Sequence, residues 1–471
     1  MTKKIIFVHA PRIEYEQNYG VTLVPLWAFA LAAYIPDDWD VEVYNTQIDG
    51  PANLVGSADV YALSGMNYDI RSVKEAREKI KTNHPDATFI VGGPMVWSME
   101  QEGKLSLLEE FDHLFILDGE ETLPKFLSDF NSRNTEETPK IIRSNRFAVS
   151  QSVPIRFDLL APTARKYYGG MIEVSRGCPF LCEFCDIRVL PGNNRSNNKS
   201  PEVIVEELDR YYKLGINQIQ FACDNFIGDI QWARACVDAI IEWRERTGAK
   251  ISIFTWLTIN LHKMPELMEK MRIAGFSIIN IGIESVNRNS LLETAKVQNT
   301  ANEIHEAVSI IQSYGFVIIP GFIFGFDSDD EEVFNDTLKF KIETGLMGGE
   351  PAFLQALAGT PLFKRLERSG RVIPADEQAA IVRKGNIGVE TYIETNVRYL
   401  LDSNFLAEGF MEFIRTYISA DFQFARFKRH MEILETYGNY IEPPDSGGYA
   451  SFWEYLKYQV TDFSNFRMLL N

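Results

Sequence analysis

The sequence predicts an α/β protein in which a doubly wound parallel sheet is followed by a partial (βα)6 barrel and a helical C-terminal domain. Three observations support this fold class. Short apolar runs alternate with amphipathic stretches in the first part of the chain, the alternation resumes after a polar segment, and the last part has a helical, aromatic pattern. With 471 residues, 45% of them hydrophobic, the chain can bury more than one core.

Residues 1–135 are expected to form the doubly wound sheet. Its strands are predicted at 5–8, 41–44, 60–63, 88–91 and 114–117. Helical patterns lie between most of these runs, which is typical of a parallel sheet whose ligands bind beyond the carboxyl ends of the strands. Gly92 and Gly93 follow the fourth strand and Asp118 and Gly119 follow the fifth, so the backbone there can approach a ligand closely.

A polar, irregular segment at 136–165 is predicted to be a linker. The second βα series is expected over 166–375, with strands near 171–175, 217–222, 250–255, 277–283, 316–324 and 352–357. Six such units predict a partial barrel, open on one side, with its active site at the carboxyl ends of the strands.

Residues 376–471 are expected to form the helical C-terminal domain. Aromatic residues recur there at spacings of two to five residues. We expect them to form the core of this domain and favour this role over that of a platform for a ligand. They are Phe405, Phe410, Phe413, Tyr417, Phe422, Phe424 and Phe427.

Composition narrows the classes of function. The formal net charge of −18 repels phosphate backbones, so we expect no nucleic-acid partner. No segment reaches the roughly 18 uninterrupted apolar residues of a membrane span, so we expect a soluble, cytoplasmic protein without a transmembrane segment.

Three of the five cysteines, Cys178, Cys182 and Cys185, fall within eight consecutive residues. This clustering fits neither a disulfide framework nor scattered core thiols, so it indicates a metal site. Iron–sulfur clusters usually have four thiolate ligands, and the other two cysteines are distant in sequence, so one iron would stay open to a small molecule. A structural zinc site completed by Asp186 or a distant histidine is the alternative.

The Cys-x3-Cys-x2-Cys spacing, with Phe184 directly before the last cysteine, resembles the motif of the radical S-adenosylmethionine (AdoMet) superfamily. The resemblance implies that the three thiolates hold a [4Fe–4S] cluster and that AdoMet chelates the open iron. One electron then splits AdoMet into methionine and a 5′-deoxyadenosyl radical, which abstracts hydrogen from a substrate. A non-enzymatic iron–sulfur redox sensor is the alternative from another class.

Residues at the predicted strand ends match positions that hold AdoMet in the superfamily. By this resemblance Glu284 accepts the ribose hydroxyls, the glycines of the fifth strand lie against adenine, and Lys296 pairs with a carboxylate. A strand-end glutamate can also cap the next helix, and Cys223 either packs or donates a hydrogen atom to a substrate radical. The matching residues are Asp224, Asn225, Gly282, Glu284, Lys296, Gly321 and Gly325.

Stretches across 20–375 resemble the cobalamin-binding-domain class of the superfamily, in the branch that contains the hopanoid C-2 methylase. Members typically carry methylcobalamin and methylate unactivated carbon. The resemblance therefore implies a cobalamin-dependent methyltransferase acting on a small-molecule or lipid-like natural product. The matching stretches include Pro25-Leu-Trp-Ala-Phe-Ala-Leu-Ala-Ala33, Val91-Gly-Gly-Pro94, Cys185-Asp-Ile187, Asp224-Asn-Phe-Ile-Gly228, Lys296-Val-Gln-Asn299 and Gly321-Phe-Ile-Phe-Gly-Phe-Asp327.

Three departures from the branch pattern bear on cofactor and substrate. Trp27 stands where a glycine is expected, and its indole could fill space that a corrin ring needs. Cys223-Asp224 replaces two acids, and Phe254-Thr-Trp-Leu-Thr258 replaces Thr-Glu-Ala-Ser at the third strand. Since these changes face the expected substrate cavity, we expect a substrate other than a hopanoid. A cobalamin-independent dehydratase, cyclase or rearrangement enzyme is the alternative.

The chain has no Asp-x-His-x-x-Gly segment, so a bound cobalamin is expected to lack a histidine as its lower ligand. The resemblance places the nucleotide tail along Gly92-Gly93 and Asp118-Gly119, with Trp27 close to the lower face. His9, after the first strand, is expected to be a loop histidine bonded to backbone.

Basic residues gather near the cysteine motif. They favour either the docking of an acidic electron donor, such as flavodoxin or ferredoxin, or a solvated loop. These residues are Arg165, Lys166, Arg176, Arg188, Arg195 and Lys199.

Overall fold

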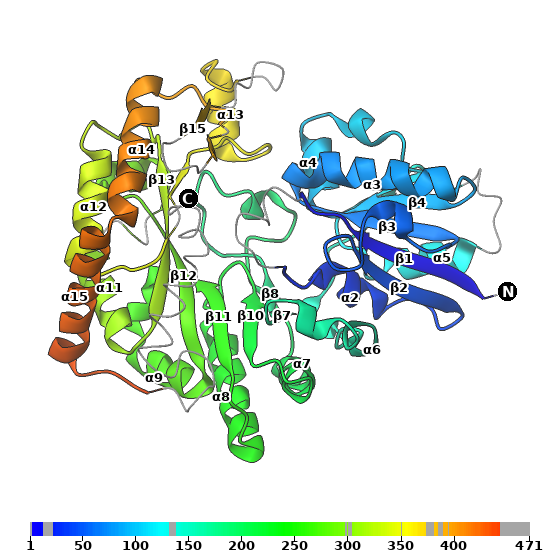
Figure 1. Cartoon of the computed structure of the whole chain (residues 1–471), viewed down its shortest axis with the longest axis horizontal. Helices are drawn as coiled ribbons and strands as arrows, with labels where there is room; N and C mark the ends of the chain where they lie inside the picture. Colours follow the sequence, from blue (N-terminus) through cyan, green and yellow to red (C-terminus); the bar gives the residue numbers. More distant parts are fainter. Residues whose placement is uncertain are drawn as a thin grey trace. The chain divides into compact units, whose positions relative to one another are not determined.

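The structure is a computed structural model of the whole chain (Figure 1). It describes residues 2–12, 22–130, 138–296, 299, 304–349, 351–373, 381–384, 390–393 and 395–442. The chain divides into two compact units. Unit 1 comprises Met1–Glu173 and Glu202–Ile216, and unit 2 comprises Val174–Pro201 and Asn217–Asn471.

Unit 1 contains a six-stranded parallel sheet in the order β2-β1-β3-β4-β5-β6. All five strands predicted for this region are present, and β6 lies in the segment expected to be a linker. The strand order is flavodoxin-like, with its topological switch point between β1 and β3. The strands are β1 (Lys3–His9), β2 (Trp39–Asn45), β3 (Val60–Ser64), β4 (Thr88–Gly92), β5 (His113–Ile116) and β6 (Ile141–Arg143).

Both faces of this sheet are buried, because successive side chains of a strand point to opposite faces. Ile6 and Val8 of β1 join one core, which α3 and α4 cover, whereas Ile5 and Phe7 join a second core against α2 and α5. This two-sided burial explains why the strands read as nearly continuous apolar runs. The helices of unit 1 are α2 (Leu26–Ala32), α3 (Ile70–Asn83), α4 (Pro94–Gln101), α5 (Thr122–Phe130), α6 (Phe157–Leu160) and α7 (Pro201–Lys213).

Unit 2 contains the second parallel sheet, with β14, β13, β12, β11 and β10 in this order. Together with β7, which directly precedes unit 2, these are the six strands predicted for the barrel, so the predicted α/β fold class is confirmed. Their bounds are β7 (Gly170–Glu173), β10 (Gln218–Ala222), β11 (Ser252–Leu257), β12 (Phe276–Glu284), β13 (Val317–Phe324) and β14 (Pro351–Phe353).

One face of this sheet is more buried than the other. Along β13, Ile318, Phe322 and Phe324 are buried, whereas Ile319 and Gly321 on the alternate face are only partly buried. This alternation is expected of a barrel strand that has helices on its outer side only. The helices are α8 (Ile230–Thr247), α9 (Pro265–Ala274), α10 (Arg288–Glu293), α11 (Ile304–Ser313), α12 (Val333–Thr344) and α13 (Pro361–Arg368).

Two further helices, α14 (Ser403–Ile418) and α15 (Ala420–Tyr437), pack against α11 and α12, so the helical C-terminal part belongs to unit 2. Phe410 and Phe413 share a core with strand β13, as predicted for these aromatics. Phe424 is 68% exposed, so the prediction is wrong for this residue. A short antiparallel hairpin of β15 (Ile381–Lys384) and β16 (Glu390–Ile393) was not predicted.

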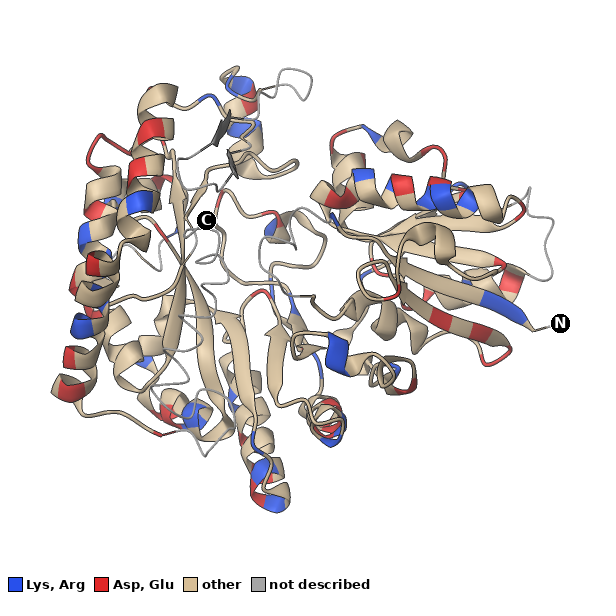
Figure 2. Cartoon of the chain, viewed as in Figure 1, with Lys and Arg blue, Asp and Glu red and all other residues tan. Residues whose placement is uncertain are grey.

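The ribbons of α12, α14 and α15 carry both acidic and basic residues (Figure 2). Opposite charges three or four residues apart on a helix attract each other weakly, as in the exposed pair of Arg429 and Glu432. Within the described residues, no helix combines the length and the apolarity that crossing a bilayer requires.

Candidate active site

The three cysteines lie on a loop of unit 2, the cysteine loop (177–196), which connects β8 (Ser175–Arg176) with β9 (Asn197–Asn198). A glycine is needed just before Cys178, because Gly177 has φ +95° and a Cβ there would lie 2.3 Å from the Arg195 carbonyl oxygen. The Gly177 amide donates to Asp224 Oδ2 at 2.5 Å, and Asn225 Nδ2 donates to Cys178 Sγ at 3.8 Å. The end of β10 therefore holds the loop.

The cysteine thiols lie in an environment that opposes ionisation. Burial raises the pKa of Cys178, and it raises the pKa of Cys185 to about 12. Metal ligands must be thiolates, so a bound cationic centre would offset this penalty, and the donor set fits an iron–sulfur cluster. Among the described side chains, no three His, Cys, Asp or Glu converge on a single metal ion. A four-iron cluster binds each thiolate at a different iron, so such convergence is not required.

A strained glutamate ends β12. Glu284 has φ +67°, and the pairing register with β13 shifts between Gly282 and Glu284. Positive φ is uncommon for a residue with a side chain and recurs at functional sites. The Glu284 carboxylate accepts a hydrogen bond from Lys296 Nζ at 2.8 Å, and both residues are buried. Burial acts to lower the pKa of Lys296, but the adjacent Glu284 outweighs it and the pKa is raised.

Two glycines lie beside this ion pair, and two buried asparagine oxygens of unit 2 lack a hydrogen-bond partner among the described residues. A Cβ on Gly282 would lie 2.1 Å from Glu284 Oε1, and Gly321 pairs with Gly282 on the neighbouring strand. Asn299 Nδ2 donates to the Gly282 and Ile283 carbonyl oxygens, while its buried Oδ1 has no hydrogen-bond partner within the part of the chain that the structure describes. The same holds for the buried Oδ1 of Asn225. Buried polar atoms are normally paired, so these acceptors fit a ligand with hydroxyl and amino donors, as AdoMet has.

The cysteine loop meets these strand-end residues through Phe184. Its ring lies 5.9 Å from Lys296 Nζ and 6.1 Å from the ring of Phe326. The structure thus brings several predicted site residues together at the carboxyl end of the unit 2 sheet. They are Phe184, Asp224, Asn225, Gly282, Glu284, Lys296 and Gly321 with the cysteine loop.

Two other residues predicted for the site, Gly325 and Cys223, are in close contact with neighbouring side chains. Gly325 has φ +98°, and a Cβ there would lie 2.5 Å from the ring of Tyr399. Cys223 Sγ lies 3.3 Å from Thr255 Oγ1 and 3.5 Å from the Trp256 carbonyl oxygen, and burial raises its pKa to about 12. These contacts agree with packing roles for both residues. The adenine contact of Gly325 and the hydrogen-atom donation by Cys223 stay predictions.

In unit 1, the glycine and aspartate residues named for cobalamin lie at or just beyond the carboxyl ends of β4 and β5, whereas Trp27 lies in α2. Gly93 has φ +86°, and a Cβ there would lie 2.2 Å from Ser64 Oγ, which donates to the Gly92 carbonyl oxygen. Ser64 ends β3, so the glycine pair lies near the switch point. Trp27 Nε1 donates to His9 Nδ1 at 3.3 Å, where a backbone partner was expected for His9.

The other pair named for cobalamin is engaged within unit 1. Asp118 forms an ion pair with Arg146 at 2.9 Å and accepts the Phe147 amide at 2.7 Å. A Cβ on Gly119 would lie 3.3 Å from Leu31 Cδ2. Asp118 therefore holds the segment that follows the sheet, and Gly119 lies against Leu31 of α2. Any nucleotide contact there stays a prediction.

Sequence reasoning missed a set of charged residues beside the cysteine loop. Arg365 binds both Glu183 and Asp327, and Arg371 also binds Asp327. These partners are 182, 38 and 44 residues apart, so no local spacing could reveal them. The one available signal was the position of Glu183 between two of the cysteines.

Comparisons with known proteins agree with this geometry. The model of the radical SAM superfamily matches residues 172–340. The hopanoid C-2 methylase of Rhodopseudomonas palustris (strain TIE-1) is 31% identical over 361 residues, which is 76% of this chain and 67% of the methylase. An uncharacterized methyltransferase of Synechocystis is 32% identical over 79% of this chain and 66% of its own length. The chain thus spans about two thirds of the length of these curated relatives.

A solved structure shares the fold. The cobalamin-dependent AdoMet radical enzyme OxsB, with aqua-cobalamin and AdoMet bound, aligns with a TM-score of 0.70 at 16% identity, over 88% of this chain and 67% of OxsB. At this identity the likeness supports the arrangement of strands and helices only. The family match and the curated relatives carry the assignment: the chain belongs to the radical SAM superfamily, whose enzymes use a [4Fe–4S] cluster and AdoMet, in the branch that contains the hopanoid C-2 methylase.

Proposed function

We propose that this enzyme is a cobalamin-dependent methyltransferase that acts on an unactivated carbon of a small-molecule or lipid-like natural product. One observation carries the proposal. The match to the hopanoid C-2 methylase covers more residues than unit 2 contains, so it extends into the sheet of unit 1. The similarity therefore includes the unit in which a second cofactor would bind.

The switch point of unit 1 fits such a cofactor. In flavodoxin-like folds, ligands bind outside the carboxyl ends of the strands at this point. Ser64 and Gly92-Gly93 offer a backbone-lined edge there, and Trp27 lies at the start of α2, fixed by its hydrogen bond to His9. Burial lowers the pKa of His9 to about 4, so this imidazole is neutral near pH 7 and its Nδ1 can accept the indole proton.

In unit 2, the chain's own residues bind and orient AdoMet. Cys178, Cys182 and Cys185 supply thiolates on the loop that Asp224 and Asn225 hold. Lys296 contacts one carboxylate oxygen of Glu284, and the other oxygen would accept a ribose hydroxyl. When bound, the cluster supplies the electron that cleaves AdoMet, and cobalamin supplies the methyl group.

We also propose a flavodoxin- or ferredoxin-type electron donor and no nucleic-acid partner. Of the six basic residues near the motif, Arg195 on the cysteine loop is exposed and available to an acidic donor, whereas the exposed Arg165 and Lys166 belong to unit 1. Lys199 is only 3% exposed, so it is unsuited to such a contact. The net charge of −18 continues to disfavour a polyanionic substrate.

Corrin binding tests the methyltransferase directly. The full chain is reconstituted anaerobically with iron, sulfide and hydroxocobalamin, desalted, and its absorbance spectrum is recorded. We expect stoichiometric corrin bands, and with AdoMet and dithionite we expect both 5′-deoxyadenosine and S-adenosylhomocysteine. Retention of the iron–sulfur absorption without corrin would rule out the methyltransferase and leave a cobalamin-independent radical enzyme.

A further inference from the structure

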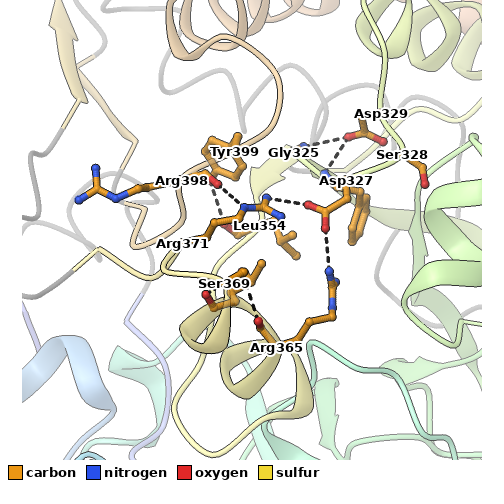
Figure 3. A network of polar contacts seen from close by, with 12 residues as sticks. Gly325, Asp327, Ser328, Asp329, Leu354, Arg365, Ser369, Arg371, Arg398 and Tyr399 are labelled. Atoms are coloured by element: carbon orange, nitrogen blue, oxygen red, sulfur yellow. Dashed lines mark hydrogen bonds and ion pairs between the residues drawn. The ribbon is translucent and has the colours of Figure 1, made fainter.

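A polar network joins helix α13 to the cysteine loop and to the end of strand β13. Figure 3 shows the part of it in which Arg365 and Arg371 contact Asp327. Arg365 of α13 donates from Nε and Nη2 to the two carboxylate oxygens of Glu183, at 2.9 and 3.1 Å. The same guanidinium donates from Nη1 to Asp327 Oδ2 at 2.7 Å. Arg371 Nη2 completes the set with a 2.7 Å hydrogen bond to Asp327 Oδ1. Two arginines and two carboxylates thus form one charge-balanced group within unit 2.

Glu183 is held at its backbone as well as at its side chain. Its amide donates to the Thr294 carbonyl oxygen at 2.8 Å, and its carbonyl oxygen accepts the Leu362 amide at 3.1 Å. Glu183 directly follows Cys182 and lies two residues before Cys185. Any displacement of Glu183 therefore moves two of the three expected cluster ligands.

The other end of the network lies beyond strand β13. The Asp327 amide donates to Glu293 Oε1 at 2.9 Å, and Asp329 accepts the amides of Gly325 and Phe326. Burial acts to raise the pKa of Asp327, but its bonds to Arg371 and Arg365 outweigh this effect and lower it. Asp327 is therefore an ionised anchor at the end of the strand that carries Gly321.

Exposed ion pairs usually contribute little to stability, but this network differs from them in geometry. The Arg365–Glu183 contact is bidentate, and bidentate pairs combine strength with a defined orientation. The side chains of Glu183 and Asp327 are 16% and 21% exposed, so solvent screens them only in part.

We propose that Arg365 is a positioning residue for AdoMet binding. By clamping Glu183 to Asp327, it fixes Cys182 and Cys185 relative to the strand ends where Glu284, Asn299 and Gly321 lie. Arg365 acts through Glu183 and does not itself touch cofactor or substrate. The inference rests on the AdoMet reaction of the superfamily and is independent of cobalamin.

The experiment compares five full-length variants with the parent chain. Arg365→Gln and Glu183→Gln each remove one partner of the clamp, and the double variant removes both partners. Arg368→Gln is the matched control, because Arg368 lies on the same helix, is exposed, and donates to the Lys364 carbonyl oxygen of that helix. Hydrogen–deuterium exchange is measured on the chain without cluster. On the reconstituted, reduced chain, the electron paramagnetic resonance (EPR) spectrum is titrated with AdoMet.

Faster exchange at the Glu183 amide is expected in both single variants and not in Arg368→Gln. The AdoMet concentration for the half-maximal spectral change should rise about tenfold in Arg365→Gln, a fold-change within the usual range for breaking such a charge pair. Arg365→Lys, which keeps the charge but loses the bidentate contact, should fall between the parent and Arg365→Gln.

The double variant separates a clamp from two independent effects. If Arg365 acts through Glu183, the double variant should match Arg365→Gln in both measurements. Additive effects of the two substitutions would overturn the proposal, and so would exchange and AdoMet titration that match Arg368→Gln. A variant that loses the cluster is judged by exchange alone, where an unchanged Glu183 amide overturns the clamp. Failure of corrin binding would rule out the proposed methyltransferase function, and the outcomes for the Arg365 variants would be unaffected.

Discussion

Single hydrogen bonds to cluster ligands have measurable consequences at the residue scale. Asn225 Nδ2 donates to Cys178 Sγ, and such bonds favour the reduced, more negative cluster. Asn225→Leu should therefore make the cluster potential more negative by roughly 60 mV, the one-electron equivalent of about 1.4 kcal/mol. A redox titration monitored by EPR measures this shift. An unchanged potential would show that this bond is absent in the loaded enzyme.

The buried pair of Glu284 and Lys296 predicts a large stability effect. Lys296→Met leaves the Glu284 carboxylate buried and unpaired, so the free energy of unfolding of unit 2 should fall by about 3–5 kcal/mol. Lys270→Met is the control, because the Lys270–Asp238 pair is about half exposed and should contribute less than about 1 kcal/mol. Urea unfolding of both variants tests the contrast, and equal losses would contradict it.

Asp329 predicts a pH dependence of stability. Burial raises its pKa from 3.8 to about 6, so between these values the folded chain binds a proton that the unfolded chain has released. The contribution of Asp329 to the free energy of unfolding is therefore fully present below pH 4 and is lost as the pH rises through 6. The total loss is about 3 kcal/mol at most. Asp329→Asn should remove this loss. The difference between parent and variant in urea unfolding at pH 4, 5 and 6 measures it, and parallel profiles would refute the assignment.

At the scale of elements, the docking of α14 depends on a glycine. A Cβ on Gly409 would lie 2.5 Å from the ring of Phe334 on α12. Gly409→Val should therefore push the helices apart and lower the free energy of unfolding by about 1–3 kcal/mol. Gly56→Val is the control, because a Cβ at Gly56 meets no atom within 4 Å. Equal urea midpoints for the two variants would contradict the close packing.

The sequence predicted the elements where periodicity spans several residues. Strands β1, β4 and β13 read as long apolar runs, and α14 and α15 as recurring aromatics, because each buries at least one face. Strand β6 was missed because Ile141–Arg143 lies in a stretch whose polar, irregular composition predicts a linker. The β15–β16 hairpin was missed because it lies in the region whose pattern predicts helices.

Some residues of the candidate site could be predicted from local sequence, and others could not. Cys178, Cys182 and Cys185 were identified from spacing alone, because their chemistry is local in sequence. The positive φ of Glu284 and the role of Asn299 could not be predicted, since both depend on how β12 and β13 pair. The contact of Arg365 with Glu183 joins residues 182 positions apart, and only the folded chain brings them together.

At the scale of the whole molecule, two compact units divide the chemistry. Unit 2 carries the cysteine loop and the strand ends at which we propose that AdoMet binds, and unit 1 carries a switch point suited to a second cofactor. The division of 1–135, 136–165, 166–375 and 376–471 expected from composition stays a prediction. Both units resemble the curated methyltransferases in sequence, which is why the two cofactors are proposed to act in one reaction.

The central claim is that three thiolates hold a four-iron cluster whose fourth iron is free to bind AdoMet. EPR spectroscopy of the anaerobically reconstituted, dithionite-reduced chain tests it most directly, with and without AdoMet. We predict the signal of a reduced [4Fe–4S] cluster that changes when AdoMet is added and that disappears in Cys182→Ala. A spectrum that AdoMet leaves unchanged, or a preparation that contains zinc and no iron, would contradict the account.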